Sequence, residues 1–452
     1  MRYLFLLFLP SLVLSSIVET PFGEVEGFEH VTEKGIPTHV FLGIRYGQAP
    51  DVHSRFKKPE MVEKWAPYRH SAKRFGAACV HTPIVGALPE DKNYSEDCLF
   101  MNIITPKLYA EDLPVFMFIH GGGFQMGAAD MFGYKRLAER VASEGIVVVT
   151  INYRLGPFGF FSLGDSVAPG NMGLWDQTLA LHFLHEILPS FGGDSSRITV
   201  GGQSAGSCAA SALQFSPHSS SLFTQSLLMS GSAITEWAVT EQVVDESRKL
   251  AAALGCLKES SVKTIDCMQE RTAEEILEAK NLFFTEYLVF LINNLFQTSS
   301  GDFFPHSIER LANTAPRKRT LSGVTDLEGA TFVTFLVMYP FTPMAVSASE
   351  WKHFSREKLI HFIETVVAPE DEHYDSASAF RRHLIEFYVE KDEKKGDYSF
   401  YLQRYTELIS DLQFLIPLYH EIQIKLDNDW PTYLYILQHI HKSSPREDPV
   451  TG

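Results

Sequence analysis

The sequence predicts an α/β protein with a mostly parallel central sheet, helices on both faces and a helical insertion. Short apolar runs rich in β-branched residues, such as GIVVVTINY (145–153), have the length and bounds of buried strands. They alternate with longer stretches whose apolar residues recur at helical spacing, such as 171–191. Strands and helices in this succession are typical of a parallel sheet that is covered on both faces.

The predicted elements follow one another along the chain. Strands are expected at 113–120, 145–153, 197–202, 226–232, 320–329 and 430–438. Helices are expected at 171–191, 207–215, 242–255 and 272–280, and the pattern from 349 to 429 is largely helical. Because the later helices fall between predicted strands, we expect one large α/β domain over residues 16–452 with a helical subdomain inserted into it.

Residues 1–15 have the layout of a secretory signal peptide. Arg2 supplies the positive charge, residues 4–14 the apolar run, and Val13 with Ser15 the small-residue cleavage site. The apolar run is too short to span the ~30 Å hydrocarbon core of a membrane. We therefore expect a secreted or extracellular protein, or one retained in the lumen of the endoplasmic reticulum, where disulfides are permitted.

Charge and cysteine content limit the partners and the redox chemistry. The formal net charge of −16 argues against nucleic acid and anionic membrane surfaces, because both require clustered Lys and Arg. The five cysteines leave at least one thiol unpaired in a single chain, and Cys208, on a predicted helix, is expected to be a small buried residue. Asn93 begins the one acceptable glycosylation sequon, Asn-Tyr-Ser.

The stretch GGQSAGS (201–207) places Ser204 two positions from Gly202 and two from Gly206. The G-x-S-x-G pattern is weak by itself, but here it lies where a predicted strand ends and a helix begins, the setting of a nucleophile elbow. A Cβ at either glycine would collide with the neighbouring strand or helix, and the helix N-terminus favours negative charge beside the serine. We expect Ser204 to be a nucleophile; the alternative is a glycine-rich turn with a capping serine.

HGGGF (120–124) follows the strand at 113–120 and offers bare backbone N–H groups. Fixed donors of this kind stabilise an oxyanion, and the loss of one typically costs ~3 kcal/mol of transition-state stabilisation. A phosphate-binding loop is one alternative, although no GK[ST] follows and Rossmann spacing is absent. A flexible turn is the other.

A carboxylate that could complete a triad follows the strand at 320–329. Nucleophile elbows place their partners in the order Ser, then Asp or Glu, then His. The turn in GVTDLEG offers Asp326 and Glu328. Composition does not choose between the two carboxylates, and a lone acidic turn is usually only solvated.

Taken together, these motifs resemble the type B carboxylesterases, the cholinesterase-like branch of the α/β-hydrolases. The resemblance covers the chain from residue 17 to its last residue and rests on many motifs in family order. They include FLGIRYGQAP, SEDCLFMNIITP, FIHGGGF, NYRLGPFGF, GNMGLWDQ, GGQSAGS, MSGSA, GDFFP and GVTDLEG.

The resemblance implies a serine carboxylic ester hydrolase that acts through an acyl-enzyme on Ser204, with Glu328 as the triad acid. It implies a small-molecule ester as substrate and neither cofactor nor metal. Gly122, Gly123 and Ala205 would supply the oxyanion-hole donors. It also implies two disulfides and two buried ion pairs, which are Cys79–Cys98, Cys256–Cys267, Arg55–Glu96 and Arg154–Asp176.

The chain departs from the family's pattern in three places. Gln203 stands where most relatives carry Glu, which removes a negative charge beside the site and weakens the case for cationic substrates. The loop from Cys79 to Cys98 lacks the tryptophan that binds choline through cation–π attraction, so cholinesterase activity is not expected. The third departure concerns the histidine, which in the family lies in a loop after the strand at 430–438.

We therefore expect the domain to be C-terminally incomplete, truncated before the catalytic His, and nearly inactive as this chain. His439 and His441 end the last strand upstream of the family's base, His420 lies in a predicted helix, and His120 precedes the oxyanion glycines, so none is expected to be the base. The alternative function is a catalytically dead cholinesterase-like binding or adhesion protein. Retention of Ser204, the oxyanion glycines and the acid favours the enzyme.

Overall fold

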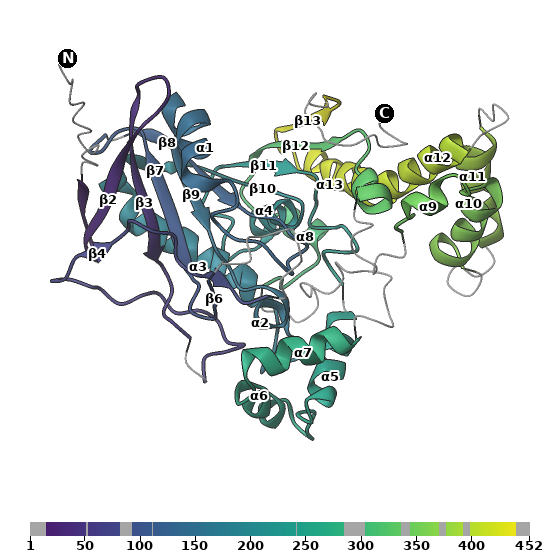
Figure 1. The fold of residues 1–452 in the computed structure, drawn as a ribbon, viewed down its shortest axis with the longest axis horizontal. Helices are drawn as coiled ribbons and strands as arrows, with labels where there is room; N and C mark the ends of the chain where they lie inside the picture. The colour runs from purple at the N-terminus through teal and green to yellow at the C-terminus, as the bar shows by residue number, and fades with distance from the viewer. Residues whose placement is uncertain are drawn as a thin grey trace, which may run out of the picture.

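The computed structural model describes residues 15–50, 53–81, 93–110, 112–240, 242–283, 303–335, 344–369, 377–391 and 398–439 (Figure 1). One large sheet has the strand order β1-β2-β3-β7-β9-β8-β10-β11-β12-β13, with β4 paired to β2. Its strands are β1 (Ser15–Thr20), β2 (Gly23–Val31), β3 (Pro37–Arg45), β4 (His70–Ser71), β7 (Phe100–Thr105), β8 (Leu113–Ile119), β9 (Val147–Ile151), β10 (Gly193–Gln203), β11 (Gln225–Met229), β12 (Arg319–Thr325) and β13 (Thr432–Leu437). The short strands β5 (Ala78–Cys79) and β6 (Tyr94–Ser95) pair with each other.

The sheet has a parallel half and an antiparallel half. From β9 through β8, β10, β11 and β12 to β13, every neighbouring pair is parallel, which confirms the predicted mostly parallel sheet. β1, β2, β3, β7 and β9 pair antiparallel. The sequence analysis did not predict this second half, because its strands mix polar and apolar residues and no helices separate β1, β2 and β3.

Helices connect the strands and form two groups at the margins of the sheet. They are α1 (Gly133–Arg140), α2 (Gly156–Phe160), α3 (Met172–Ile187), α4 (Ala205–Phe215), α5 (Gln242–Ala253), α6 (Ser261–Gln269), α7 (Ala273–Phe283), α8 (Ile308–Ala312), α9 (Ala348–Trp351), α10 (Arg356–Phe362), α11 (Ala377–Ile385), α12 (Tyr398–Ser410) and α13 (Ile416–Asp427). Short 3₁₀ and π turns adjoin several of them, at Ala142–Glu144, Leu188–Phe191, Thr331–Phe335, Ile363–Val367, Glu386–Glu390 and Asp411–Leu415.

The helical insertion has two parts. Helices α5–α8 lie between β11 and β12 in the sequence, and α9–α13 lie between β12 and β13. In Figure 1, α5–α7 form a group below the sheet, whereas α9–α12 project to the right of α13. No helix within the described ranges is long and apolar enough to cross a membrane.

The main core extends across both halves of the sheet. Strand β9 is buried at every position, and so is helix α4. A strand that is buried on both faces has no polar side to alternate with, which is why VVVTI is apolar except for Thr150, whose hydroxyl accepts from Asn102 Nδ2 at 2.9 Å. Helix α4 consists largely of Ala, Ser, Gly and Cys, and these small side chains let it pack closely against β10 and β11.

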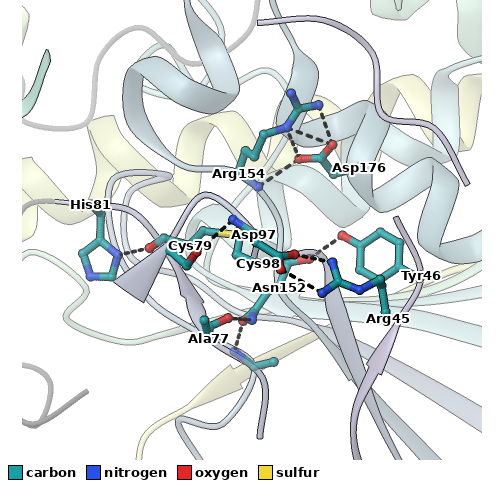
Figure 2. The surroundings of a disulfide bond; sticks show 12 residues. Arg45, Tyr46, Ala77, Cys79, His81, Asp97, Cys98, Asn152, Arg154 and Asp176 are labelled. Atoms are coloured by element: carbon teal, nitrogen blue, oxygen red, sulfur yellow. Dashed lines mark hydrogen bonds and ion pairs between the residues drawn. A yellow bond between two sulfur atoms is a disulfide. The ribbon is translucent and has the colours of Figure 1, made fainter. Parts of the chain in front are cut away.

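The structure joins Cys79 to Cys98 and Cys256 to Cys267, the two pairs that the resemblance implies. The fifth cysteine, Cys208, is a buried free thiol on α4. Figure 2 shows the first disulfide beside Arg45, Asp97 and Asn152. This disulfide therefore links the two ends of the segment 80–97, and residues 82–92 of that segment lie outside the described part of the chain.

The two expected ion pairs are present; Arg154–Asp176 is buried, whereas Arg55–Glu96 is only partly buried. Arg154 Nη2 lies 2.6 Å from Asp176 Oδ1, and the same carboxylate accepts the Arg154 backbone N–H at 2.9 Å (Figure 2). Arg55 Nε donates to Glu96 Oε2 at 2.6 Å, and Arg55 Nη1 donates to the carbonyl of Gln269 at 3.1 Å. Arg55 therefore ties the segment before β7 to α6.

Candidate active site

Ser204 occupies the turn between β10, which ends at Gln203, and α4, which begins at Ala205. Its backbone has φ 57° and ψ −126°, a conformation that costs an L-residue free energy and persists only where the surroundings impose it. The Ser204 N–H donates to the carbonyl of Met229 at 2.8 Å, and its carbonyl accepts from Ser207 N at 2.8 Å. The strand, turn and helix predicted around the serine are thus present, with the serine held in a strained conformation.

Glycines flank the serine because nothing larger fits. A Cβ at Gly202 would lie 2.3 Å from the backbone of Gly206, and one at Gly206 would lie 2.1 Å from the carbonyl oxygen of Ile119. Both distances are far below van der Waals contact. The strand β8, the end of β10 and the start of α4 can therefore approach one another only through bare backbone.

The HGGGF loop passes directly beside the serine. A Cβ at Gly121 would lie 2.4 Å from the carbonyl oxygen of Gln203 and 3.1 Å from Ser204 Cβ. Gly122 and Gly123 have positive φ values of 113° and 59°. Their N–H groups lie in this tight loop, and the N–H of Ala205 is at the first turn of α4, where backbone donors have no partner within the helix. The three expected oxyanion donors thus come from two elements that meet at Ser204.

His120 has a supporting position under this loop. Its side chain is buried, its Nδ1 lies 2.9 Å from the carbonyl oxygen of Gly121, and its ring stacks on Tyr153 with centroids 4.5 Å apart. Tyr153 Oη donates to the carbonyl of His120 at 2.9 Å, and burial raises the pKa of this phenol well above its usual value. Tyr153 therefore remains a hydrogen-bond donor that fixes the start of the loop.

The two candidate acids have different surroundings. Glu328 is half-buried, and its Oε1 accepts the Thr325 N–H at 2.7 Å, whereas Asp326 is exposed. Burial raises the pKa of Tyr435 on β13, and the charge of Glu328 raises it further. Glu328 therefore faces protein and lies within electrostatic reach of β13. Both turns, after β10 and after β12, lie at the carboxyl edge of the sheet, two strands apart, or ~10 Å.

Histidines near this edge do not complete a triad within the described residues. There, no histidine hydrogen bonds to the Ser204 hydroxyl or the Glu328 carboxylate. His439 follows β13 and is exposed, and His420 is exposed on α13. His441 lies outside the described part of the chain. Within the same residues, no group of three His, Cys, Asp or Glu side chains could hold a metal ion.

A buried ion pair beneath the serine was not found by the sequence analysis. Glu421 Oε1 lies 2.6 Å from Lys425 Nζ on α13, and both side chains are at most 1% exposed. Glu421 Oε2 accepts the Ala233 N–H at 3.1 Å and the Ser232 hydroxyl. Burial by itself would raise the pKa of Glu421, but the Lys425 ammonium and the hydrogen bonds outweigh it and lower the pKa. Glu421 is therefore a buried carboxylate anchor.

This anchor is connected to the nucleophile turn through Gly231. A Cβ at Gly231 would lie 2.5 Å from the carbonyl oxygen of Ser204, and the Gly231 carbonyl accepts the Ser207 hydroxyl at 2.7 Å. Glu421 thus holds the 231–233 segment, and this segment packs against the backbone of Ser204. A Glu–Lys pair at i, i+4 usually lies on a solvated helix face, so only the apolar residues around it could have signalled burial.

A mostly parallel sheet with helices, whose strand β10 leads through a strained serine turn into α4, is consistent with the α/β-hydrolase fold. The chain belongs to the carboxylesterase family, whose model matches residues 14–452. It is 34% identical over 428 residues to gut esterase 1 of Caenorhabditis briggsae, covering 94% of this chain and 74% of that protein. Identity to gut esterase 1 of Caenorhabditis elegans is 33% over 431 residues, covering 94% and 75% of the two chains. Mouse cholinesterase is 35% identical over 335 residues, with 71% of this chain and 54% of that protein covered.

Proposed function

We propose that the protein is a secreted serine carboxylic ester hydrolase that forms an acyl-enzyme on Ser204. The observation that carries this proposal is the backbone of Ser204, held at φ 57° between β10 and α4 by three glycine contacts too close for any side chain. Nothing about a capping serine requires that strain. Family membership supports the same reaction class.

In the proposed reaction, the Ser204 hydroxyl attacks the carbonyl carbon of the ester while a histidine takes its proton. The N–H groups of Gly122, Gly123 and Ala205 stabilise the oxyanion of the tetrahedral intermediate. The histidine returns the proton to the leaving alcohol, and water then releases the acid by the same route in reverse. Glu328 orients the imidazole and stabilises its charged form.

The resemblance places this histidine in a loop after β13, and residues 440–452 lie outside the described part of the chain. The low activity expected of these 452 residues stays a prediction. A triad without its base retains a rate only ~10³–10⁴ above water. Turnover of p-nitrophenyl butyrate well above that level, lost in His441→Ala, would show that the chain does carry its base.

The ester test uses Ser204→Ala with Ser221→Ala as a matched control, since Ser221 is an exposed serine that follows α4. In protein whose turnover exceeds the residual level, we expect Ser204→Ala to lower p-nitrophenyl butyrate turnover to that level and Ser221→Ala to leave it unchanged. Turnover above the residual level that survives Ser204→Ala would overturn the proposal.

Secretion is part of the proposal and has independent support. The structure holds two disulfides, which are typical of oxidising compartments, and Asn93 is exposed next to the first of them. We also propose that residues 16–452 form one domain, because β1 and β13 belong to one sheet; residues 1–14 lie outside the described part. Protein secreted from eukaryotic cells should lose mass on glycosidase treatment, and Asn93→Gln should abolish that shift. A cytosolic, unglycosylated product would contradict the localisation.

A further inference from the structure

We propose that Glu421 on α13 is a positioning residue for the nucleophile, because its carboxylate holds the segment 231–233 against the backbone of Ser204. The inference rests on the proposed function of Ser204 and adds to it a residue 189 positions from Ser232, the side chain it accepts from. Glu421 is 1% exposed, so it acts through this segment and not on the substrate.

The segment 231–233 begins where the strand before it has ended. Strand β11 ends at Met229, and the chain turns through Ser230, whose φ is 61°. Beyond this turn, the Ala233 N–H donates to Glu421 Oε2 at 3.1 Å, and the Ser232 hydroxyl donates to the same oxygen. Both donors are buried, and a buried donor that loses its acceptor costs free energy. The carboxylate therefore fixes the segment after β11.

The same segment packs against the peptide groups of Ser204. A Cβ at Gly231 would lie 2.5 Å from the Ser204 carbonyl oxygen, so bare backbone fills this place. The Ser207 hydroxyl donates to the Gly231 carbonyl at 2.7 Å, and the Ser204 carbonyl accepts the Ser207 N–H at 2.8 Å. The Ser204 N–H donates to the carbonyl of Met229 at 2.8 Å. The chain around Gly231 thus borders both peptide groups of Ser204, and a shift of this chain would move the nucleophile.

The two oxygens of the Glu421 carboxylate have different partners. Oε1 lies 2.6 Å from Lys425 Nζ, whereas Oε2 accepts from the segment 231–233. The contact with Lys425 keeps a buried charge paired and thereby serves stability. A glutamine amide carries no charge, but its carbonyl oxygen still accepts hydrogen bonds. Positioning and stability can therefore be separated by substitution.

Two double variants make this separation. Glu421→Gln, Lys425→Met removes the ion pair and keeps an oxygen acceptor, whereas Glu421→Met, Lys425→Met removes both with an unbranched side chain of similar length. The first measurement is hydrogen exchange of the Ser204, Ser207 and Cys208 amides, which does not depend on turnover. Exchange there should be at least tenfold faster in the methionine variant than in the glutamine variant. The amides of β9, three strands from β11, are the reference and should exchange alike in both.

The functional measurement is the rate at which a fluorophosphonate ester labels Ser204. The methionine variant should react at least tenfold more slowly than the glutamine variant, because misplacement of a reacting group by ~1 Å can cost ~100-fold in rate. Val389→Ala is the control for stability, since it truncates a buried side chain in the helical group between β12 and β13. It should lower stability in urea denaturation without slowing the labelling.

The proposal is overturned if the two double variants exchange alike at Ser204, Ser207 and Cys208, or if exchange in β9 rises by the same factor. Equal labelling rates in the two double variants would overturn it as well. Where the parent protein is not labelled, the exchange rates alone decide. Failure of the proposed function would show separately, as an adduct on another residue with Ser204 unmodified.

Discussion

The two turns that hold Ser204 and Glu328 lie at one edge of the same sheet but are built in different ways. The Ser204 turn is enclosed by segments buried in the core, with backbone contacts at Gly202 and Gly206 that exclude any side chain. The Glu328 turn leads to β13, which exposes Tyr433, Ile436 and Leu437 by 60%, 49% and 51%. The nucleophile side is thus fixed by close backbone packing, whereas the acid side depends on segments distant in sequence and open to solvent.

The acid side gives the largest expected effect. In protein whose turnover exceeds the residual level, Glu328→Gln should lower kcat about 10⁴-fold, because the imidazole loses the partner that orients it. Asp326→Asn is the matched control and should change kcat less than twofold, since Asp326 is exposed. Equal losses in both variants, measured with p-nitrophenyl butyrate, would remove the distinction between the two carboxylates. At the residual level neither change should matter, because triad members act as a unit.

The buried anchor beneath the nucleophile turn should give the next effect. Lys425→Met leaves the Glu421 carboxylate buried without its cation, and we expect a loss of ~3–5 kcal/mol in the free energy of unfolding. The double variant Glu421→Gln, Lys425→Met should recover part of this loss. Urea denaturation of four proteins, the parent, Glu421→Gln, Lys425→Met and the double variant, measures the coupling. An additive double variant would mean that the two side chains do not stabilise each other.

The same pair gives a pH dependence of known sign. The pKa of Glu421 is lower in the folded chain than in the unfolded one, so its contribution to stability is complete above the unfolded value of ~4.3. That contribution is lost as the pH falls through the folded value. Unfolding free energies measured between pH 6 and pH 3 should therefore fall less steeply in Glu421→Gln than in the parent protein.

Gly206→Ala tests the close packing of the nucleophile side. Its Cβ would lie 2.1 Å from the Ile119 carbonyl oxygen, and backbone must move to admit it, so we expect a loss of ~3 kcal/mol or more. Gly145→Ala is the control, because Gly145 has φ 89° but no atom within 4 Å of its Cβ position. Its backbone strain alone should cost ~1–2 kcal/mol. Because Gly206 lies in α4 without a positive φ, a loss no larger than that of Gly145→Ala in urea denaturation would mean that the close contact does not require glycine there.

The open edge should give the smallest effect on stability but a clear one on association. In the described part of the chain β13 pairs only with β12, and its exposed apolar side chains form an edge of the kind that promotes aggregation. Ile436→Lys should reduce light scattering at a given protein concentration while changing the free energy of unfolding by less than ~0.5 kcal/mol. Unchanged scattering would mean that another surface drives association.

The Ser204 turn and the Glu328 turn also differ in how well the sequence predicts them. The nucleophile turn is predictable because its determinants, Gly202, Ser204 and Gly206, are adjacent in sequence to a strand and a helix with clear patterns. The turn residues alone do not choose Glu328 over Asp326, although the resemblance implies Glu328, because the two differ in burial. The Gly329 N–H after Glu328 donates to Ser410 Oγ, about eighty residues later. Lys280 also contacts Gln125 from a helix that is distant in sequence, and no spacing in the sequence indicates that contact.

The central claim is that the strained turn makes Ser204 the nucleophile. Incubation of the protein with a fluorophosphonate ester for several hours, followed by peptide mass mapping, tests it most directly. The account predicts one phosphonyl adduct, on Ser204, and none in Ser204→Ala. An adduct on Ser207 or another residue, with Ser204 unmodified, would contradict it.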